Sequence, residues 1–472
     1  MGDSSQDGYV NMIGLLVTLT ACVYTVVRLV IIDKWNSVSP ITWVVLANAA
    51  YFGFGPLLRF LGDELTVARA SVLYPVDQQM LRSIIILNTL FMVTVLGGFL
   101  AFSRLIPREV PPNRDGDLAE IDARAWFLAL GTLAVGCFMR YFFCFPHEFG
   151  QTKTILPGVF YQLELFVPIS LAPIFFLSAR KGLGMRSIGV SLLLVEIVIG
   201  FLRAAKSAIL FAILMAIVGA FLSRQSKVTL GVLIVLFVSC MTFVADPLMN
   251  LRESIIETQR IHGPIGLGDR LELVGQLYSR GSLFEASMSG NAAWARLDYS
   301  SVQAYVMNRY DRGFPGSPYV NTIWAFVPRI LYPEKPKTSE IGLVLGRLMI
   351  GRSTRTFIGA GFAAEAYWAG GWLFVVVVGL GVGAMFGSMQ WMLYRIPTVA
   401  IWTFFPCYIL ALKMAVRIDG FFSIDCAGAY VIFLAAYTVA YFAEQTIYPT
   451  SQKLTLDDSA EYPADGPYIA RS

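Results

Sequence analysis

Long apolar runs limit the fold of this chain more than any other feature of its sequence. Runs of about 18 residues or more recur along its 472 residues, and a helix of that length crosses a hydrocarbon layer of about 30 Å. Backbone polar groups find no partner in lipid, so such runs must be helices or strands of a closed barrel. Barrel strands would be about ten residues long with strict alternation, a pattern that this sequence lacks.

The composition indicates the same class. Hydrophobic residues make up 56% of the chain and charged residues 14%, against about 45–50% and about 25% in soluble domains. We therefore predict an all-α polytopic integral membrane protein with about 11 (10–12) transmembrane helices. The predicted spans are 10–32, 41–61, 83–103, 125–145, 158–178, 187–202, 207–222, 228–245, 361–389, 391–416 and 424–443.

These spans divide the chain into four regions. Residues 1–245 hold about eight spans, 246–360 form one large extracytoplasmic loop with short helices, 361–443 hold about three spans, and 444–472 are a disordered cytoplasmic tail. The first ten residues carry two aspartates and no basic residue, so residues 10–32 are expected to be a retained span rather than a signal peptide.

Lysine and arginine in the connections predict the orientation, because cytoplasmic loops carry an excess of them. With the N-terminus outside, the cytoplasmic connections hold eleven basic residues and the short outside connections hold six. The eleven are Lys34, Arg104, Arg108, Arg114, Arg124, Arg180, Lys181, Arg186, Arg224, Lys227 and Arg395, and the six are Arg69, Arg82, Lys153, Arg203, Lys206 and Arg417. This bias favours an N-terminus and a large loop (246–360) on the outer side of the membrane, with the C-terminus in the cytoplasm.

Several partner classes are not expected. The net charge of +4 is small and the basic residues fall mostly in loops, so no nucleic-acid partner is predicted. The six cysteines lie in or beside apolar segments without a CxxC spacing, which favours buried apolar side chains over a disulfide frame or zinc site. With only two histidines, we predict no metal site, and we predict no cofactor.

The large loop is rich in arginine. Arginine outnumbers lysine there by eleven to two, and arginine is preferred where a planar fork must grip phosphate or carboxylate. The loop's ten acidic residues offer another reading, in which the arginines only form ion pairs on a folded ectodomain. The arginines are Arg252, Arg260, Arg270, Arg280, Arg296, Arg309, Arg312, Arg329, Arg347, Arg352 and Arg355.

Charged residues also interrupt two apolar regions. In GFLRAAKSAIL (200–210), Arg203 and Lys206 lie three residues apart between apolar runs, either as functional groups or as anchors at a membrane interface. Glu164 and Glu196 fall inside predicted spans, where a lone carboxylate is costly. Glu196 precedes Arg203 by about two helical turns, so one helix face could carry both; no partner is predicted for Glu164.

The segment GAGFAAEAYWAGGW (359–372) leads into the ninth predicted span. Small residues flank Glu365 and allow close approach of a helix or a ligand. Glu365 could act as a general base or as a structural partner of a loop arginine. Walker, GxSxG and HExxH motifs are absent.

Two segments together resemble a known family. GSPYVNTIWAFVPRILYPEKP (316–336), followed by GAGFAAEAYWAGGW with Glu365, Tyr367 and Gly370, resembles the bacterial oligosaccharide repeat-unit polymerases, the Wzy-type O-antigen polymerases. GFLRAAKS approximates another element of that family but departs from its tighter Gly–Ser–Arg form, and Arg417 in VRIDGFF fits a further one. The resemblance covers roughly residues 200 to 420, and the rest matches in hydropathy only.

The resemblance implies a GT-C-like, inverting, metal-independent glycosyltransferase at the periplasmic face of the bacterial inner membrane. It would join undecaprenyl-diphosphate-linked oligosaccharides into a surface polysaccharide, with a chain-length regulator and a flippase as candidate protein partners. Arginine forks would stabilise the leaving diphosphate and a carboxylate would deprotonate or position the acceptor hydroxyl. The candidate bases are Asp298, Asp311 and Glu365; the candidate binding residues are Arg329, Arg296, Arg309, Arg312, Arg352, Arg203, Lys206, Arg417 and Tyr367.

Two other functions stay open at this point. An O-antigen ligase would transfer a lipid-linked glycan to a lipid A core sugar, and these motifs do not exclude it. A transporter or flippase of lipid-linked saccharides is the other, although no internal repeat supports it. In the polymerase reading, Pro328, Pro333 and Pro336 prevent a regular helix in FVPRILYPEKPKTSE (326–340) and hold Arg329 toward a lipid diphosphate.

Overall fold

The structure is a computed structural model, and the part of the chain that it describes is helical. It describes residues 3–32, 39–62, 74–105, 118–152, 156, 158–223, 227–263, 265–283, 297–320, 322–325, 327, 332, 334, 340–351, 357–396 and 398–447. Within these ranges there are helices, turns and loops but no strand. The all-α prediction is therefore confirmed for them.

Within the described residues, seven helical stretches are long and apolar enough to cross a membrane. Each coincides with a predicted span, so the prediction of a helical membrane protein is confirmed at this level. Apolar side chains such as Val17 and Val23 point outward from the first stretch, as contact with lipid requires. The stretches are Asp7–Leu29, Pro40–Leu61, Gln78–Leu105, Ala119–Glu148, Leu183–Leu202, Phe362–Tyr394 and Ala427–Ile447.

The other four predicted spans are shorter or broken. Residues 158–178 form two helices, α8 (Gly158–Glu164) and α9 (Phe166–Lys181), separated at Leu165. The helices α11 (Lys206–Leu222) and α12 (Lys227–Phe243) have 17 residues each. Residues 391–416 divide among the end of α18 (Phe362–Tyr394), the short η5 (Thr398–Trp402) and α19 (Phe405–Ala415). The total of eleven spans stays a prediction.

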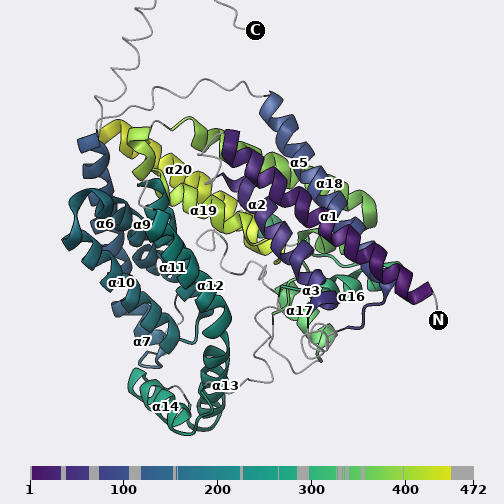
Figure 1. Ribbon diagram of the computed structural model, residues 1–472, viewed down its shortest axis with the longest axis horizontal. Helices are drawn as coiled ribbons and strands as arrows, with labels where there is room; N and C mark the ends of the chain where they lie inside the picture. Colours follow the sequence, from purple (N-terminus) through teal and green to yellow (C-terminus); the bar gives the residue numbers. More distant parts are fainter. Residues whose placement is uncertain are drawn as a thin grey trace, which may run out of the picture.

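The helices form two groups, each around its own apolar core. The first contains α1 (Asp3–Ile32), α2 (Pro40–Asn48), η2 (Ala49–Phe54), α5 (Gln78–Leu105), α16 (Ser300–Asp311), α18 (Phe362–Tyr394) and α20 (Ala427–Ile447). The short α3 (Gly55–Leu61) follows η2 and packs beside α1. The second contains α6 (Leu118–Met139), α9, α10 (Leu183–Leu202), α11 and α12. Helix α19 joins them, because Cys407 and Ala411 lie in the first core and Ile409 and Leu412 in the second (Figure 1).

The two ends of the helix bundle differ. The first residues of α6 meet the last turns of α9 and α20, where Arg180 contacts Asp122 and Arg124 contacts Glu444. The opposite end carries η3 (Arg140–Cys144), α7 (Phe145–Glu148), α13 (Ala245–His262), α14 (Leu267–Ser279), α16, η4 (Thr322–Ala325), α17 (Glu340–Met349) and η6 (Phe422–Cys426). Figure 1 shows α7, α13, α14, α16 and α17 along the lower side of the molecule. The described helices of region 246–360 thus gather at one end.

The predicted cytoplasmic tail begins within a helix. Helix α20 continues past Glu444 to Ile447, so the first four residues assigned to the tail are helical. Residues 448–472 lie outside the described residues.

Glycines set the closest helix contact in the first group, between α5 and α18. A Cβ at Gly383 would lie 2.0 Å from the carbonyl oxygen of Val95, and one at Gly379 would lie 2.0 Å from Thr94 Oγ1. Gly98 presents the same restriction from α5 toward Leu380. Small residues at such spacing let two backbones approach closely, which stabilises helix pairs in lipid.

Replacing Gly383 tests this packing. We expect Gly383→Leu to force α5 and α18 apart and to lower stability by about 1–3 kcal/mol or more, as overpacking does. Gly381 is the matched control, since a Cβ there meets nothing within 4 Å and Gly381→Ala removes helix-interior glycine entropy of roughly 0.5–1 kcal/mol. Thermal unfolding of the purified protein measures both; equal losses would contradict the assigned contact.

Candidate functional site

The predicted element GFLRAAKS forms the turn between α10 and α11. Helix α10 ends at Leu202 and α11 begins at Lys206. Between them Ala204 has a φ of +50°, a left-handed conformation that non-glycine residues rarely adopt. Lys206 is partly buried at the first position of α11 and takes part in a contact. The turn directs Arg203 into a group of buried charges.

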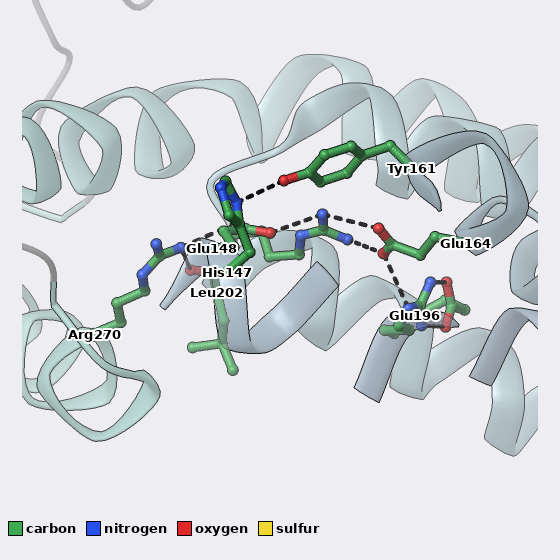
Figure 2. Close-up of polar contacts among 9 residues, drawn as sticks. His147, Glu148, Tyr161, Glu164, Glu196, Leu202 and Arg270 are labelled. Atoms are coloured by element: carbon green, nitrogen blue, oxygen red, sulfur yellow. Dashed lines mark hydrogen bonds and ion pairs between the residues drawn. The ribbon is translucent and has the colours of Figure 1, made fainter. Parts of the chain in front are cut away.

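Six side chains of alternating charge form this group, which we call the ion chain. Arg203 Nη2 lies 2.8 Å from Glu148 Oε2, and Arg203 Nη1 contacts Glu164. Arg140 binds Glu164 through Nε at 3.1 Å and holds both oxygens of Glu196, with Nη2 at 2.9 Å from Oε2. The contacts form a continuous series, which runs Arg270, Glu148, Arg203, Glu164, Arg140, Glu196. Figure 2 shows these contacts, with Arg270 and the three glutamates labelled.

The ion chain is balanced in charge, and four of its six side chains are buried, while Arg203 and Glu148 are partly buried. It holds three arginines and three glutamates, and aromatic rings cover the guanidinium groups: Arg203 and Arg140 lie over Phe145, and Arg270 lies over Phe149. Burial lowers the pKa of Arg203, but Glu148 and Glu164 outweigh this and raise it above its usual value. The positive charge of Arg203 is therefore neutralised within the fold, and we assign it a structural role.

The structure pairs the two glutamates with arginines of other segments. The sequence allows Glu196 and Arg203 to share one helix face, but Glu196 pairs with Arg140, and Glu164 pairs with Arg203. The difference arises because α10 ends at Leu202, so Arg203 leaves the helix and turns toward α8. Arg140 was missed; its signal was a charge inside the apolar run 125–145, comparable to that of Glu164.

The remaining predicted residues that the structure describes lie in the first helix group. Asp298 is buried, with Oδ2 at 2.5 Å from Arg59 Nε and Oδ1 accepting the amide of Ser300 at 2.8 Å. It therefore holds the first amide of α16 and ties that helix to α3. With both oxygens engaged inside the protein, Asp298 is positioned for support rather than for proton transfer.

Glu365 is fully buried near the beginning of α18. One of its oxygens, Oε2, accepts the amide of Phe422, and the preceding residues reach the same segment: Gly361 N donates to Gly420 O and Phe362 N to Ile418 O, both at 3.0 Å. Hydrogen bonds thus join two segments named in the family resemblance, 359–372 and 416–422. Glu365 orients the second segment.

Helix α18 is interrupted where it meets α16. The helix breaks at Gly370 and Gly371, and Gly371 has a φ of +67°. A Cβ at Gly371 would lie 2.9 Å from the hydroxyl of Tyr310, so glycine is required both by conformation and by space. The break lets the last turn of α16 pack against α18.

Four predicted residues lie at the end of α16 and on the facing part of α18, and we call them the α16–α18 site: Arg309, Asp311, Arg312 and Tyr367. Tyr367 is buried and its hydroxyl donates to Asp311 Oδ1 at 2.8 Å. Asp311 and Arg312 are exposed and Arg309 is half-buried, its guanidinium 5.5 Å from the centre of the Phe314 ring. Asp311 is the one exposed carboxylate among the three candidate bases.

A second carboxylate group lies next to Glu365. Arg417, with 53% of its side chain exposed, contacts Asp425 at 3.2 Å. Asp419 was missed from the motif VRIDGFF; its Oδ2 accepts the Tyr299 hydroxyl at 2.6 Å, and its Oδ1 is buried without a hydrogen-bond partner. Burial raises the pKa of Asp419, although Tyr299 and Arg417 act in the opposite direction.

Three predicted binding residues, Arg296, Arg329 and Arg352, lie outside the described residues, as do Pro328, Pro333 and Pro336. Of that proline-rich segment the structure describes Tyr332, which stacks on Trp324 with ring centres 5.3 Å apart. Among the described residues no group of three or more histidine, cysteine or acidic side chains forms a metal site. All six cysteines are free thiols, and five of them are buried.

Comparison with protein-family models, with curated proteins and with solved structures gave no match.

Removing the centre of the ion chain is expected to destabilise the protein strongly. Glu164→Ala leaves Arg140 and Arg203 without a shared partner, and breaking a buried pair costs about 3–5 kcal/mol. Asp7→Ala is the control, because Asp7 and Arg82 form an exposed pair worth about 1 kcal/mol or less. Unfolding of both purified variants by denaturant gives the comparison; a similar small loss in each would contradict the structural role.

Asp419 predicts a pH dependence of stability. Its pKa is raised in the folded protein, so the folded state binds the proton more tightly than the unfolded chain. The folded state is then favoured at acidic pH and loses stability as pH rises from the unfolded pKa of about 3.8 through the raised value. We expect Asp419→Asn to unfold at a higher temperature than wild type at pH 7, with the difference shrinking toward pH 4. A pH-independent difference would show that burial of the charge is not its cause.

Proposed function

We propose that this protein is a membrane-embedded, metal-independent glycosyltransferase that joins lipid-linked oligosaccharide units into a polysaccharide. The observation that carries the proposal is the α16–α18 site, where an exposed carboxylate lies between two arginines and accepts a hydroxyl hydrogen bond from Tyr367. The resemblance of 316–336 and 359–372 to repeat-unit polymerases supports the same reaction, and its second segment supplies Tyr367 and the helix break.

We also propose eleven membrane passes in a GT-C-like arrangement in the bacterial inner membrane. The four shorter helical stretches would then cross together with the seven long ones. Eleven crossings bring both the connection 203–205 and the region 246–360 to one side, in agreement with their position at one end of the bundle (Figure 1). The excess of basic residues at the other connections favours the periplasm for that side.

In the proposed reaction Asp311 is the general base. It accepts the proton from the acceptor sugar hydroxyl, whose oxygen forms a bond to the anomeric carbon of the donor with inversion. The bond from that carbon to the donor's diphosphate breaks, and undecaprenyl diphosphate leaves with the electron pair. The last turn of a helix carries a partial negative charge, which attracts cations.

Arginine would supply the charge that this departure needs. Arg309 and Arg312 flank Asp311 in sequence and are permanently charged, so they can hold the diphosphate without a metal ion. Arg417 is exposed and is a further candidate for the acidic substrate. Glu365 and Asp298 would act by positioning: Glu365 holds the segment that carries Arg417, and Asp298 fixes the first turn of α16.

Variants of Asp311 test the proposal in membranes supplied with lipid-linked repeat units. We expect Asp311→Asn to slow chain extension by about 10²–10⁴-fold, as loss of a general base does. Arg309→Ala and Arg312→Ala should each slow it by roughly 10²-fold, the scale of losing one charge-stabilising donor. Single-repeat product on the lipid carrier should accumulate in each case, visible as the loss of a ladder on a gel.

Arg104→Ala is the control, because Arg104 is exposed in the last turn of α5, away from the site; it should keep the wild-type ladder. Wild-type ladders for all three site variants would exclude this site. Deletion of the gene separates the functions: full-length polymer retained on the lipid carrier would indicate a ligase, and unextended units retained at the cytoplasmic face would indicate a flippase.

A further inference from the structure

The helices α13 and α14 form a hairpin with a small core of its own. Leu251 and Ile255 of α13 pack with Ile265 and with Leu273 and Val274 of α14, separately from the cores of the two helix groups. The hairpin meets the membrane helices through Phe201 and Ala204, which border this small core. Its position at the lower edge of the bundle is visible in Figure 1. The hairpin is therefore a separate structural unit, which can detach from the bundle without unfolding the rest of the protein.

One charged side chain attaches α14 to the bundle. Arg270 is the buried residue of α14, and its Nη1 donates to the Leu202 carbonyl at 3.2 Å and to Glu148 Oε1 at 3.5 Å. Its Nε is buried without a hydrogen-bond partner. Figure 2 shows Arg270 at the outer end of the ion chain, where it approaches Glu148.

The attachment through Arg270 is the weakest link of the ion chain. Arg203 reaches the same carboxylate at 2.8 Å, so Glu148 stays paired when Arg270 leaves. Burial lowers the pKa of Arg270 by more than Glu148 restores, whereas the carboxylates around Arg203 raise its pKa. Hydration therefore lowers the free energy of Arg270 more than that of Arg203, so Arg270 leaves its partners more easily.

The turn beside this attachment is strained. Ala204 is the one non-glycine residue with positive φ in the described chain, and it lies between Arg203 of the ion chain and the small core of the hairpin. Its neighbour Leu202 provides the carbonyl that Arg270 binds. A conformation of this kind persists only where the surroundings enforce it, and here the docked hairpin is part of those surroundings.

We propose that the α13–α14 hairpin is a hinged clasp that docks on and releases from the second helix group, with Arg270 as its latch. In the docked state Arg270 binds Glu148 and the Leu202 carbonyl, and the turn at Ala204 is held in its strained form. On release Arg270 becomes hydrated, Glu148 keeps Arg203, and the turn relaxes. Because the ion chain shares its carboxylates, the state of the clasp changes the field at Arg203 and at its neighbours. The proposal does not depend on the glycosyltransferase assignment.

Hydrogen exchange measured by mass spectrometry on the full-length protein in lipid nanodiscs tests the clasp. An undocked helix of 13 residues is marginal in water, so exchange of α14 amides reports release. We expect α14 to exchange at least about tenfold faster than α11 in the wild type. Arg270→Gln should accelerate α14 further, by about tenfold or more, and leave α16 unchanged.

Two more variants complete the test. Arg280→Gln removes an exposed arginine at the other end of α14 and should leave exchange unchanged. Ala204→Gly relieves the strained conformation in the docked state and should slow α14 exchange about two- to fivefold. This variant tests the clasp independently if Arg270→Gln does not fold. Exchange of wild-type α14 as slow as that of α11 would overturn the clasp, as would equal effects of Arg270→Gln and Arg280→Gln or an unchanged rate in Ala204→Gly.

Discussion

Charges that lie among apolar helices must be paired inside the protein, and this requirement organises the second helix group. Lipid offers no hydrogen-bond partner, and an unpaired ion there is far more costly than in water. Glu164 meets the requirement by accepting from Arg140 and Arg203, which come from different segments. A single carboxylate thus fixes where α8, η3 and the end of α10 lie relative to one another. Hydrophobic contact alone would not fix them, because lipid is as apolar as a side chain.

The first helix group solves the same problem differently. Its principal contact, between α5 and α18, depends on glycines that let the two backbones meet. Two of its ion pairs lie at one end, beyond most of the apolar length. Asp298 with Arg59 and Arg417 with Asp425 join loop segments to helix ends there. The group therefore has a rigid apolar body and an end where carboxylates and arginines meet, which is the arrangement on which the proposed chemistry rests.

The fold class was predictable from the sequence because the length of apolar runs is a local property. The seven long spans are local in this sense, and each was found. The break at Leu165 and the division of 391–416 were not, since they depend on what α9 and α19 pack against. The ion-pair partners of the buried charges were harder still to predict from the sequence. The charges Glu164 and Glu196 were recognisable as costly, but their partner Arg140 comes from another helix, and sequence spacing only proposes partners on the same one.

Burial, which the sequence does not reveal, separates the three candidate bases. From the sequence, Glu365 and Asp298 were as plausible as Asp311 for the general base, since each is a carboxylate near arginines or small residues. In the structure Glu365 is fully enclosed and holds a backbone amide, and both oxygens of Asp298 are engaged. A base must reach its proton at hydrogen-bonding distance in a bound substrate. Asp311 meets that condition because it lies at the exposed end of α16, with Tyr367 holding one oxygen. The buried carboxylates Glu365 and Asp298 have a structural role, since they hold the segments around Arg417 and Asp311 in place.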